Sequence, residues 1–300
     1  MAAQELAPSA DLINAPDMQR LAGVTASSDK RISWRDFLAS GQAHLVIHRH
    51  SRLEKSLLNG SRNSQATDLL YQQDVRMATF ESNWEKIYSE NPDYRSWYPW
   101  TEVVTFVFRN APRDRKREEV SILELGSGTG NNLWFAAREG FRVSGIDISK
   151  TAVDFARKRF ADEGLTGDFR IGDFSKLPFP DQSFDLVFDR GSLSMTNRQG
   201  TIDCVNEVRR VIKPDGLFQC GPNSDRDSSF YRTSDEDGLV RDITVGILVC
   251  GQARFFSLQD MRDTFRDGWK FESLQHIDET DFLNPARLSH SRWLAVLRAK

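Results

Sequence analysis

From Val120 onward the chain alternates short apolar runs with stretches in which apolar residues recur at helical spacing. The apolar runs predict strands over 120–125, 141–147, 168–172, 184–189 and 217–220, and two more near 269–277 and 291–298. Helices are expected over 130–139 and 202–212 and from Ser149 and Ser257 onward, with a turn at 213–216. This alternation predicts an α/β protein with a doubly wound, mostly parallel sheet.

The segment before Val120 has a weaker pattern. Residues 1–28 show no sustained periodicity and are expected to be a mobile tail. Residues 29–79 carry apolar positions at broadly helical spacing, broken at Asn59-Gly60-Ser61. We expect them to form a helical N-terminal extension that caps the main domain.

Composition and charge limit the classes of function. The 300 residues carry a formal net charge of −3, which does not favour a nucleic acid as partner. The first residues lack the basic and apolar segments of a signal peptide, and no apolar stretch approaches membrane-spanning length. We therefore expect a cytoplasmic protein without membrane contact; its oligomeric state stays open.

Cysteine and histidine spacing does not predict a metal site. Three cysteines are too scattered for a zinc site or a disulfide framework and are expected to be buried thiols: Cys204, Cys220 and Cys250. Three histidines lie close together but lack a nearby acidic ligand: His44, His48 and His50. No metal is expected.

A glycine-rich turn follows the first predicted strand. It contains Gly126, Gly128 and Gly130 and leads into a helix. Glycine lets the backbone turn sharply and approach a ligand closely, and the helix N-terminus offers unpaired N–H groups. The turn indicates a nucleotide-type cofactor site, although tight turns without a ligand also use glycine.

Three acidic residues stand where such a sheet would present them to one crevice. Glu124 lies near the end of the first strand, Asp147 ends the second, and Asp173 follows the third. A carboxylate at the end of the second strand can accept both hydroxyls of a ribose, which favours that role for Asp147 over a helix cap. Asp173 could accept an adenine amine, or it could be a solvated turn residue.

A nicotinamide dinucleotide enzyme would also use a glycine turn and an acid at the end of the second strand. Its fingerprint is G-x-G-x-x-G, whereas Asn131 stands here where the third glycine should fall. That alternative also gives Asp173 no role, so it is disfavoured.

Four motifs in order resemble those of the class I S-adenosylmethionine-dependent methyltransferases: the run Glu124 to Gly130, Gly145-Ile146-Asp147-Ile148-Ser149, Gly172-Asp173 and the stretch Leu177 to Val187. The resemblance covers residues 80–300. It implies a Rossmann-like sheet of seven strands with the last antiparallel, and S-adenosylmethionine as cofactor. The implied cofactor contacts are Glu124, Gly126, Ser127, Gly128, Gly130, Asp147, Ile148, Asp173, Phe174, Asp189, Arg190, Trp84 and Tyr88.

Aromatic residues gather upstream of the first strand. Trp84 and Tyr88 are four residues apart and would share one face of a helix. Aromatic faces stabilise a cation such as a sulfonium by about 0.5–2 kcal/mol each, but plain packing on the sheet explains them equally well. In small-molecule methyltransferases a helix here closes over the cofactor, so 80–109 are expected to be lid helices, and the insertion 222–255 is expected to cover the substrate. Candidate substrate contacts are Tyr98, Trp100, Ser192, Asp225, Tyr231 and Arg232.

The acceptor is less defined than the cofactor. Asp189 is the first candidate for a general base, ahead of Asp225 and His276. Adenine amino-methylation would require an Asn/Asp-Pro-Pro-aromatic motif after the fourth strand, where Asp189-Arg190-Gly191-Ser192 stands instead. Cytosine methylation is also argued against, because it would require a cysteine nucleophile, usually after proline, and none of the three cysteines follows one.

The expected function is methyl transfer to a small molecule, at an oxygen of a sugar or secondary metabolite. Two alternatives remain. Carbon methylation of a quinone or lipid-like ring would be favoured by an apolar crevice, whereas acids and arginines in the crevice would favour a sugar. A binding module that holds the cofactor without turnover is the alternative from another class.

Overall fold

A computed structural model describes residues 83–231, 234–244, 251–283 and 288–300. All of them belong to one compact unit, Gln65–Lys300. The expected tail 1–28, the expected cap 29–79, Cys250 and the three histidines at positions 44, 48 and 50 lie outside the described residues.

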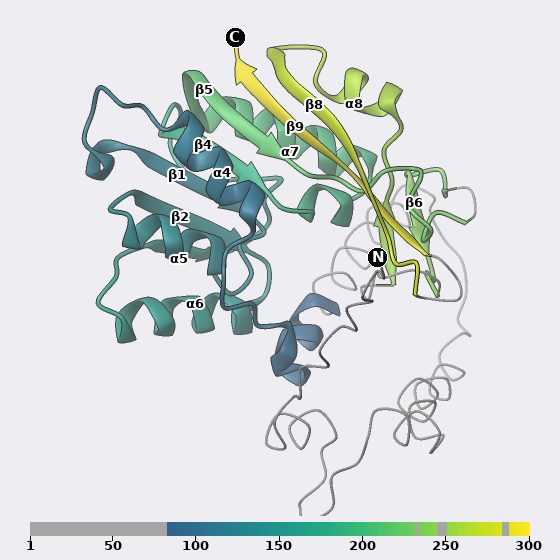
Figure 1. Cartoon of the computed structure of the whole chain (residues 1–300), viewed down its shortest axis with the longest axis horizontal. Coiled ribbons are helices and arrows are strands. Elements are labelled where there is room, and N and C mark those ends of the chain that lie inside the picture. The colour runs from purple at the N-terminus through teal and green to yellow at the C-terminus, as the bar shows by residue number, and fades with distance from the viewer. Residues whose placement is uncertain (1–82, 232–233, 245–250, 284–287) are drawn as a thin grey trace, which may run out of the picture. The chain divides into compact units, whose positions relative to one another are not determined.

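A seven-stranded sheet organises the described part of the chain (Figure 1). Its strand order is β3-β2-β1-β4-β5-β9-β8. The strands are β1 (Ser121–Leu125), β2 (Arg142–Asp147), β3 (Asp168–Ile171), β4 (Phe184–Asp189), β5 (Ile212–Cys220), β8 (Trp269–Thr280) and β9 (Ser289–Ala299). Neighbours from β3 to β5 pair in parallel, whereas β9 lies antiparallel between β5 and β8. The predicted fold, including the antiparallel last strand, is confirmed.

Helices cover both faces of this sheet (Figure 1). One face packs against α4 (Thr101–Asn110), α5 (Asn131–Arg138) and α6 (Lys150–Asp162), and the other against α7 (Arg198–Val211) and α8 (Leu258–Thr264). Alternate residues of β4 pack into the hydrophobic cores on the two faces of the sheet. Leu186 and Phe188 belong to the core under α4, α5 and α6, and Val187 belongs to the core under α7 and α8. This two-residue period is what a strand buried on both faces requires.

The region around α7 differs from its prediction. The helix begins at Arg198 and not at 202, because the Asn197 side chain accepts a hydrogen bond from the Gly200 amide and caps it. The expected turn at 213–216 is a bulge within β5, where the pairing with β4 shifts register and Asp215 has a φ of 61°. The helix expected from Ser257 onward is confirmed as α8, and Ser257 and Asp260 form a capping box at its start.

Within the expected insertion 222–255 the structure adds a feature that was not predicted. The strands β6 (Leu239–Arg241) and β7 (Gln252–Arg254) pair antiparallel as a separate two-stranded sheet. Its apolar side packs Val240 against Ala253 and Phe255. Across the described ranges, no helix has the length and apolar character that crossing a membrane requires.

Candidate active site

The glycine turn lies between β1 and α5 and is closely covered by other side chains. Gly126 and Gly128 have φ values of 58° and 50°, which favour glycine. A Cβ atom added at Gly126 would lie 2.0 Å from the Ser192 hydroxyl, and one added at Gly128 would lie 2.6 Å from the Tyr88 hydroxyl. Ser192, after β4, and Tyr88, before β1, therefore both lie against this turn.

Asp147 joins the end of β2 to this turn. Its carboxylate accepts hydrogen bonds from the amides of Gly128 and Ser149, both at 2.8 Å. Burial raises the pKa of Asp147 to about 6, against the lowering effect of these two hydrogen bonds. Each carboxylate oxygen still has a lone pair for a ribose hydroxyl, so the geometry suits the predicted role. Ile148, beside it, is half-buried.

Glu124 supplies a buried oxygen without a partner. Its Oε1 accepts a hydrogen bond of 2.7 Å from the Asn132 amide, whereas its Oε2 has no hydrogen-bond partner among the described residues. Burial raises the pKa of Glu124 well above its ordinary range, and the charges of Asp147 and Asp189 add to this. A buried acceptor beside a glycine cradle fits a donor such as the amino group of the cofactor's methionine part.

The start of α5 holds the segment before α4 in place, a role that the sequence analysis did not assign. Asn132 accepts from the Trp100 amide, Asn131 donates to the Tyr98 carbonyl, and Thr129 donates to the Ser96 carbonyl. One residue could have indicated this role. Asn131 stands where a dinucleotide-binding turn has its third glycine, and an asparagine side chain there can form a hydrogen bond to an adjacent backbone segment.

A helix over 83–90 places Tyr88 against the turn, and its role as a lid stays a prediction. The rings of Trp84 and Tyr88 lie 5.9 Å apart on it. Glu85 ties the helix to α6 by accepting from the Ser149 hydroxyl at 2.7 Å and from the amide and hydroxyl of Thr151. Burial alone would raise the pKa of Glu85, but these hydrogen bonds outweigh it and lower that pKa. Glu85 was missed because its partners lie far away in the sequence.

Burial, together with the charges of Asp147 and Glu124, raises the pKa of the Tyr88 phenol. The phenol is therefore neutral at physiological pH and lies near two carboxylates. Contact of Trp84 and Tyr88 with the cofactor stays a prediction.

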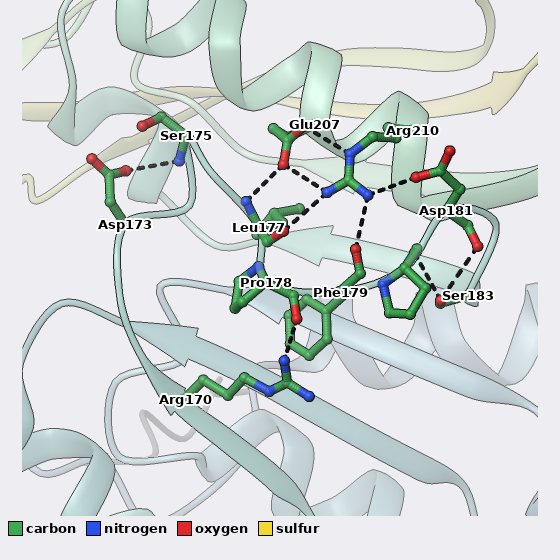
Figure 2. Close-up of polar contacts among 11 residues, drawn as sticks. Arg170, Asp173, Ser175, Leu177, Pro178, Phe179, Asp181, Ser183, Glu207 and Arg210 are labelled. Atoms are coloured by element: carbon green, nitrogen blue, oxygen red, sulfur yellow. Dashed lines mark hydrogen bonds and ion pairs between the residues drawn. The ribbon is translucent and has the colours of Figure 1, made fainter.

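The loop after β3 is anchored from α7 (Figure 2). Asp173 accepts a hydrogen bond from the Ser175 amide at 2.7 Å, and Phe174 packs partly against the core. Arg210 donates to the carbonyls of Leu177 and Phe179, while Glu207 accepts from the Leu177 amide. The loop that would hold the adenine is thus fixed at its base, with Asp173 bonded as a turn residue.

Asp189 ends β4 and is almost fully buried. Its Oδ1 accepts a hydrogen bond of 3.0 Å from the Leu193 amide, and its Oδ2 has no hydrogen-bond partner in the described ranges. Burial raises its pKa to about 6, opposed by backbone hydrogen bonds from the loop that follows β4 and from Gly221 after β5. The carboxylate therefore organises the short helix η4 (Ser192–Met195) and keeps one acceptor oxygen, so its role as a base stays a prediction.

Beside Asp189, a charged cluster joins three elements. Arg190 Nε and Arg292 Nη2 lie 3.3 and 3.4 Å from the same Glu102 oxygen at the start of α4. The Arg190 guanidinium also stacks over the half-exposed Trp100 ring at 4.0 Å. The sequence analysis placed Arg190 and Trp100 near the site, but Glu102 and Arg292 lacked any local motif and were missed.

The remaining candidate residues are more dispersed. Tyr98 is 77% exposed and stacks edge-on against Trp134. Asp225 is exposed and lines a separate cleft of about 140 Å³ with Arg198, Arg254 and Asp260. Tyr231 donates to the Asp242 carbonyl, and Arg232 lies outside the described residues. The His276 Nε2 lies 2.7 Å from the Ser224 hydroxyl.

The two cysteines that the structure describes are buried, as expected. Burial raises the pKa of both Cys204 and Cys220, so neither is a poised thiolate.

Comparison with known proteins supports the cofactor class. Residues 122–216 match a family model described as a methyltransferase domain. The fatty-acid O-methyltransferase of Mycolicibacterium smegmatis is 36% identical over 100 residues, which cover 32% of this chain and 35% of that protein. The demethylmenaquinone methyltransferase of Tropheryma whipplei is 40% identical over 99 residues, 32% of this chain and 38% of that protein.

Fold comparison extends over more of the chain. The 1,6-didemethyltoxoflavin-N1-methyltransferase of Burkholderia thailandensis, solved with bound S-adenosylhomocysteine, superposes with a TM-score of 0.56 at 14% identity, covering 84% of this chain and 98% of that one. The chain spans 26–40% of the length of the curated relatives it matches. The glycine turn, the acids at the strand ends and these matches identify residues 122–216 as a methyltransferase domain. S-adenosylmethionine is the cofactor that the resemblance of its motifs to the class I methyltransferases implies.

Proposed function

We propose that this chain transfers a methyl group from S-adenosylmethionine to an oxygen atom of a small polar molecule, a sugar or a secondary metabolite. The observation that carries the proposal is the polar acceptor side of the site, where Asp189, Arg190 and Arg292 gather at the carboxyl ends of β4 and β5. Acids and arginines there favour a polar acceptor over an apolar ring.

The cofactor supplies an electrophilic methyl group on a sulfonium. Glu124, the glycine turn and Asp147 would hold it, while Tyr88 and Trp84 exclude water from above. An acceptor oxygen held in line behind that methyl group would take it as the sulfonium leaves as a thioether, so in-line positioning by the site would provide much of the rate. Asp189, with a pKa of about 6 and one oxygen without a hydrogen bond among the described residues, would take the hydroxyl proton.

Carbon methylation of a quinone or lipid-like ring remains the alternative. Relatives named as sterol and demethylmenaquinone methyltransferases support it. Their similarity covers only 99–107 residues, and the family model ends at residue 216, before Arg292 and the insertion 222–255. The relatives therefore support the cofactor half of the proposal more strongly than any acceptor.

The proposal includes a cytoplasmic location. It also includes no nucleic acid partner, in line with the net charge of −3. It also distinguishes an enzyme from a binding module. Asp189→Asn should leave S-adenosylhomocysteine affinity within about threefold while it abolishes turnover, because the asparagine keeps an oxygen that can accept from the Leu193 amide and loses the group that takes the proton.

Two measurements test the proposal. Calorimetry should detect S-adenosylhomocysteine binding that Asp147→Ala weakens by about tenfold or more, since a carboxylate with two hydroxyl partners is lost. The isotopically labelled methyl group should then enter a molecule from a cell extract, to be identified by mass spectrometry. Absence of cofactor binding would refute the cofactor assignment; binding without any labelled product in all extracts would support the binding module.

A further inference from the structure

Two arginines that are distant in the sequence meet at the acceptor side of the site. Arg190 directly follows β4, and Arg292 lies on β9, where it bridges to Asn223 just beyond the end of β5. Both reach the same Glu102 oxygen, at 3.3 and 3.4 Å. The pair therefore lies at the carboxyl ends of the parallel strands, where Asp189 and the glycine turn also lie and where ligands of such sheets bind.

The positive charge of this pair is only partly compensated. The Arg292 side chain is only 9% exposed. Nevertheless, its Nε and Nη1 have no hydrogen-bond partner in the described part of the chain, and neither has Arg190 Nε. The Glu102 contacts meet the distance for an ion pair without hydrogen-bond geometry. Glu279 is 3.8 Å from Arg292 but 63% exposed, so solvent screens its charge.

The electrostatics of Arg190 reflect this environment. Burial lowers the pKa of its guanidinium, the Glu102 charge opposes this, and the Arg292 charge adds to the lowering. A guanidinium nevertheless stays charged in a protein. One buried and one partly buried cation, with three buried N–H groups that lack a hydrogen-bond partner in the described part of the chain and with one shared carboxylate, are costly unless a ligand completes them.

We propose that Arg190 and Arg292 bind a carboxylate or phosphate group of the methyl acceptor. This inference rests on the proposed function and specifies its substrate class as an anionic small molecule. The planar guanidinium fork matches an oxyanion, and two forks with three free donors can satisfy its several lone pairs. Trp100, stacked under Arg190 and 45% exposed, provides a flat surface beside the anion.

The test uses inorganic phosphate and acetate as probes on the full chain. The unfolding temperature is measured as sodium phosphate replaces sodium chloride at constant ionic strength, with and without saturating S-adenosylhomocysteine. We expect a saturable rise in the natural protein, a smaller one with acetate, and loss of both in Arg292→Gln and Arg190→Gln. Arg159→Gln is the matched control, because Arg159 is equally buried, pairs with Glu163 at 3.3 Å and stacks on Trp134, but lies on α6.

A gain of affinity guards against variants that fail to fold. Glu102→Gln removes the shared carboxylate, so phosphate should bind about threefold tighter or more. Absence of a phosphate effect in the natural protein would overturn the inference, as would a rise that persists in both arginine variants. Loss of S-adenosylhomocysteine binding in those variants would overturn it too, because the pair would then hold the cofactor's own carboxylate. If the natural protein does not bind S-adenosylhomocysteine, the proposed function is refuted instead. The effect of phosphate on the unfolding temperature, measured without S-adenosylhomocysteine, then still tests the arginine pair.

Discussion

The Tyr88 hydroxyl closes directly over Gly128, so that a Cβ atom at Gly128 would lie 2.6 Å from it. The lid helix and the glycine turn are therefore fitted to each other at a single contact. Side chains from before β1 and from the turn after it form one surface, and a change in either should affect the other.

Replacing Gly128 by alanine should lower S-adenosylhomocysteine affinity by about tenfold or more, because the methyl group meets the phenol and because a φ of 50° strains an alanine by about 1 kcal/mol. In a Tyr88→Phe background the same change should cost less, since the next atom, Cζ, is 3.5 Å away. Calorimetry on the four proteins measures the coupling. Equal losses in both backgrounds would contradict the contact.

Glu85→Ala should loosen the lid helix, because the hydrogen bonds to Ser149 and Thr151 disappear. We expect faster amide hydrogen exchange over 83–90 and a fall in S-adenosylhomocysteine affinity of about three- to tenfold. Glu90→Ala, at an exposed position of the same helix, is the control and should change neither. Unchanged exchange in Glu85→Ala would show that packing alone holds the lid.

The raised pKa of Asp147 should appear in the pH dependence of stability. Its pKa is about 6 in the folded protein and 3.8 ordinarily, so between these values the unfolded chain loses a proton that the folded protein keeps. Its contribution to the free energy of unfolding therefore falls as pH rises through this window, by on the order of 1–3 kcal/mol, and stays lower above about pH 6.

Urea unfolding of the natural protein and of Asp147→Asn, at several values between about pH 4 and about pH 7, measures this effect as a difference. Asp185→Asn serves as the control. Burial alone would raise the pKa of Asp185, but hydrogen bonds from Lys213, Ser121 and Arg115 outweigh burial and lower that pKa. The difference in the free energy of unfolding between the natural protein and Asp185→Asn should therefore be flat above about pH 5. A flat difference for Asp147→Asn as well would refute the assigned pKa shift.

Arg210→Ala should destabilise the loop after β3 by about 1–3 kcal/mol, because two backbone carbonyls lose their donor and Glu207 loses its ion-pair partner (Figure 2). Arg209→Ala, next to it on α7, removes an exposed contact to Lys300 and should cost less than about 0.5 kcal/mol. Equal free energies of unfolding for the two variants would mean that the loop is held by its apolar residues.

Local signals predicted most of the sheet. Periodicity located the strands because the residues that each strand buries are apolar and lie within the strand itself. Ser257 located the start of α8 because a capping box is a contact over three residues. The glycine turn was predictable for the same reason, because β1, the turn and α5 follow one another directly along the chain, and Asp147 was predictable because it ends the next strand.

Contacts between distant segments were not predictable. The partners of Glu85, the carbonyls held by Arg210, and the meeting of Arg190 with Arg292 depend on which elements pack together, and no short motif encodes them. The strands β6 and β7 were missed because three residues each are too short to show alternation.

The place of β9 between β5 and β8 has a consequence for synthesis. The glycine turn, Asp147 and Asp189 belong to β1, β2 and β4, which leave the ribosome long before β9 does. Arg292 is carried by β9 and can join Arg190 only after that strand has inserted between its two neighbours. A growing chain would therefore acquire the pocket for its methyl donor first, and become selective for its acceptor only when the last strand is in place.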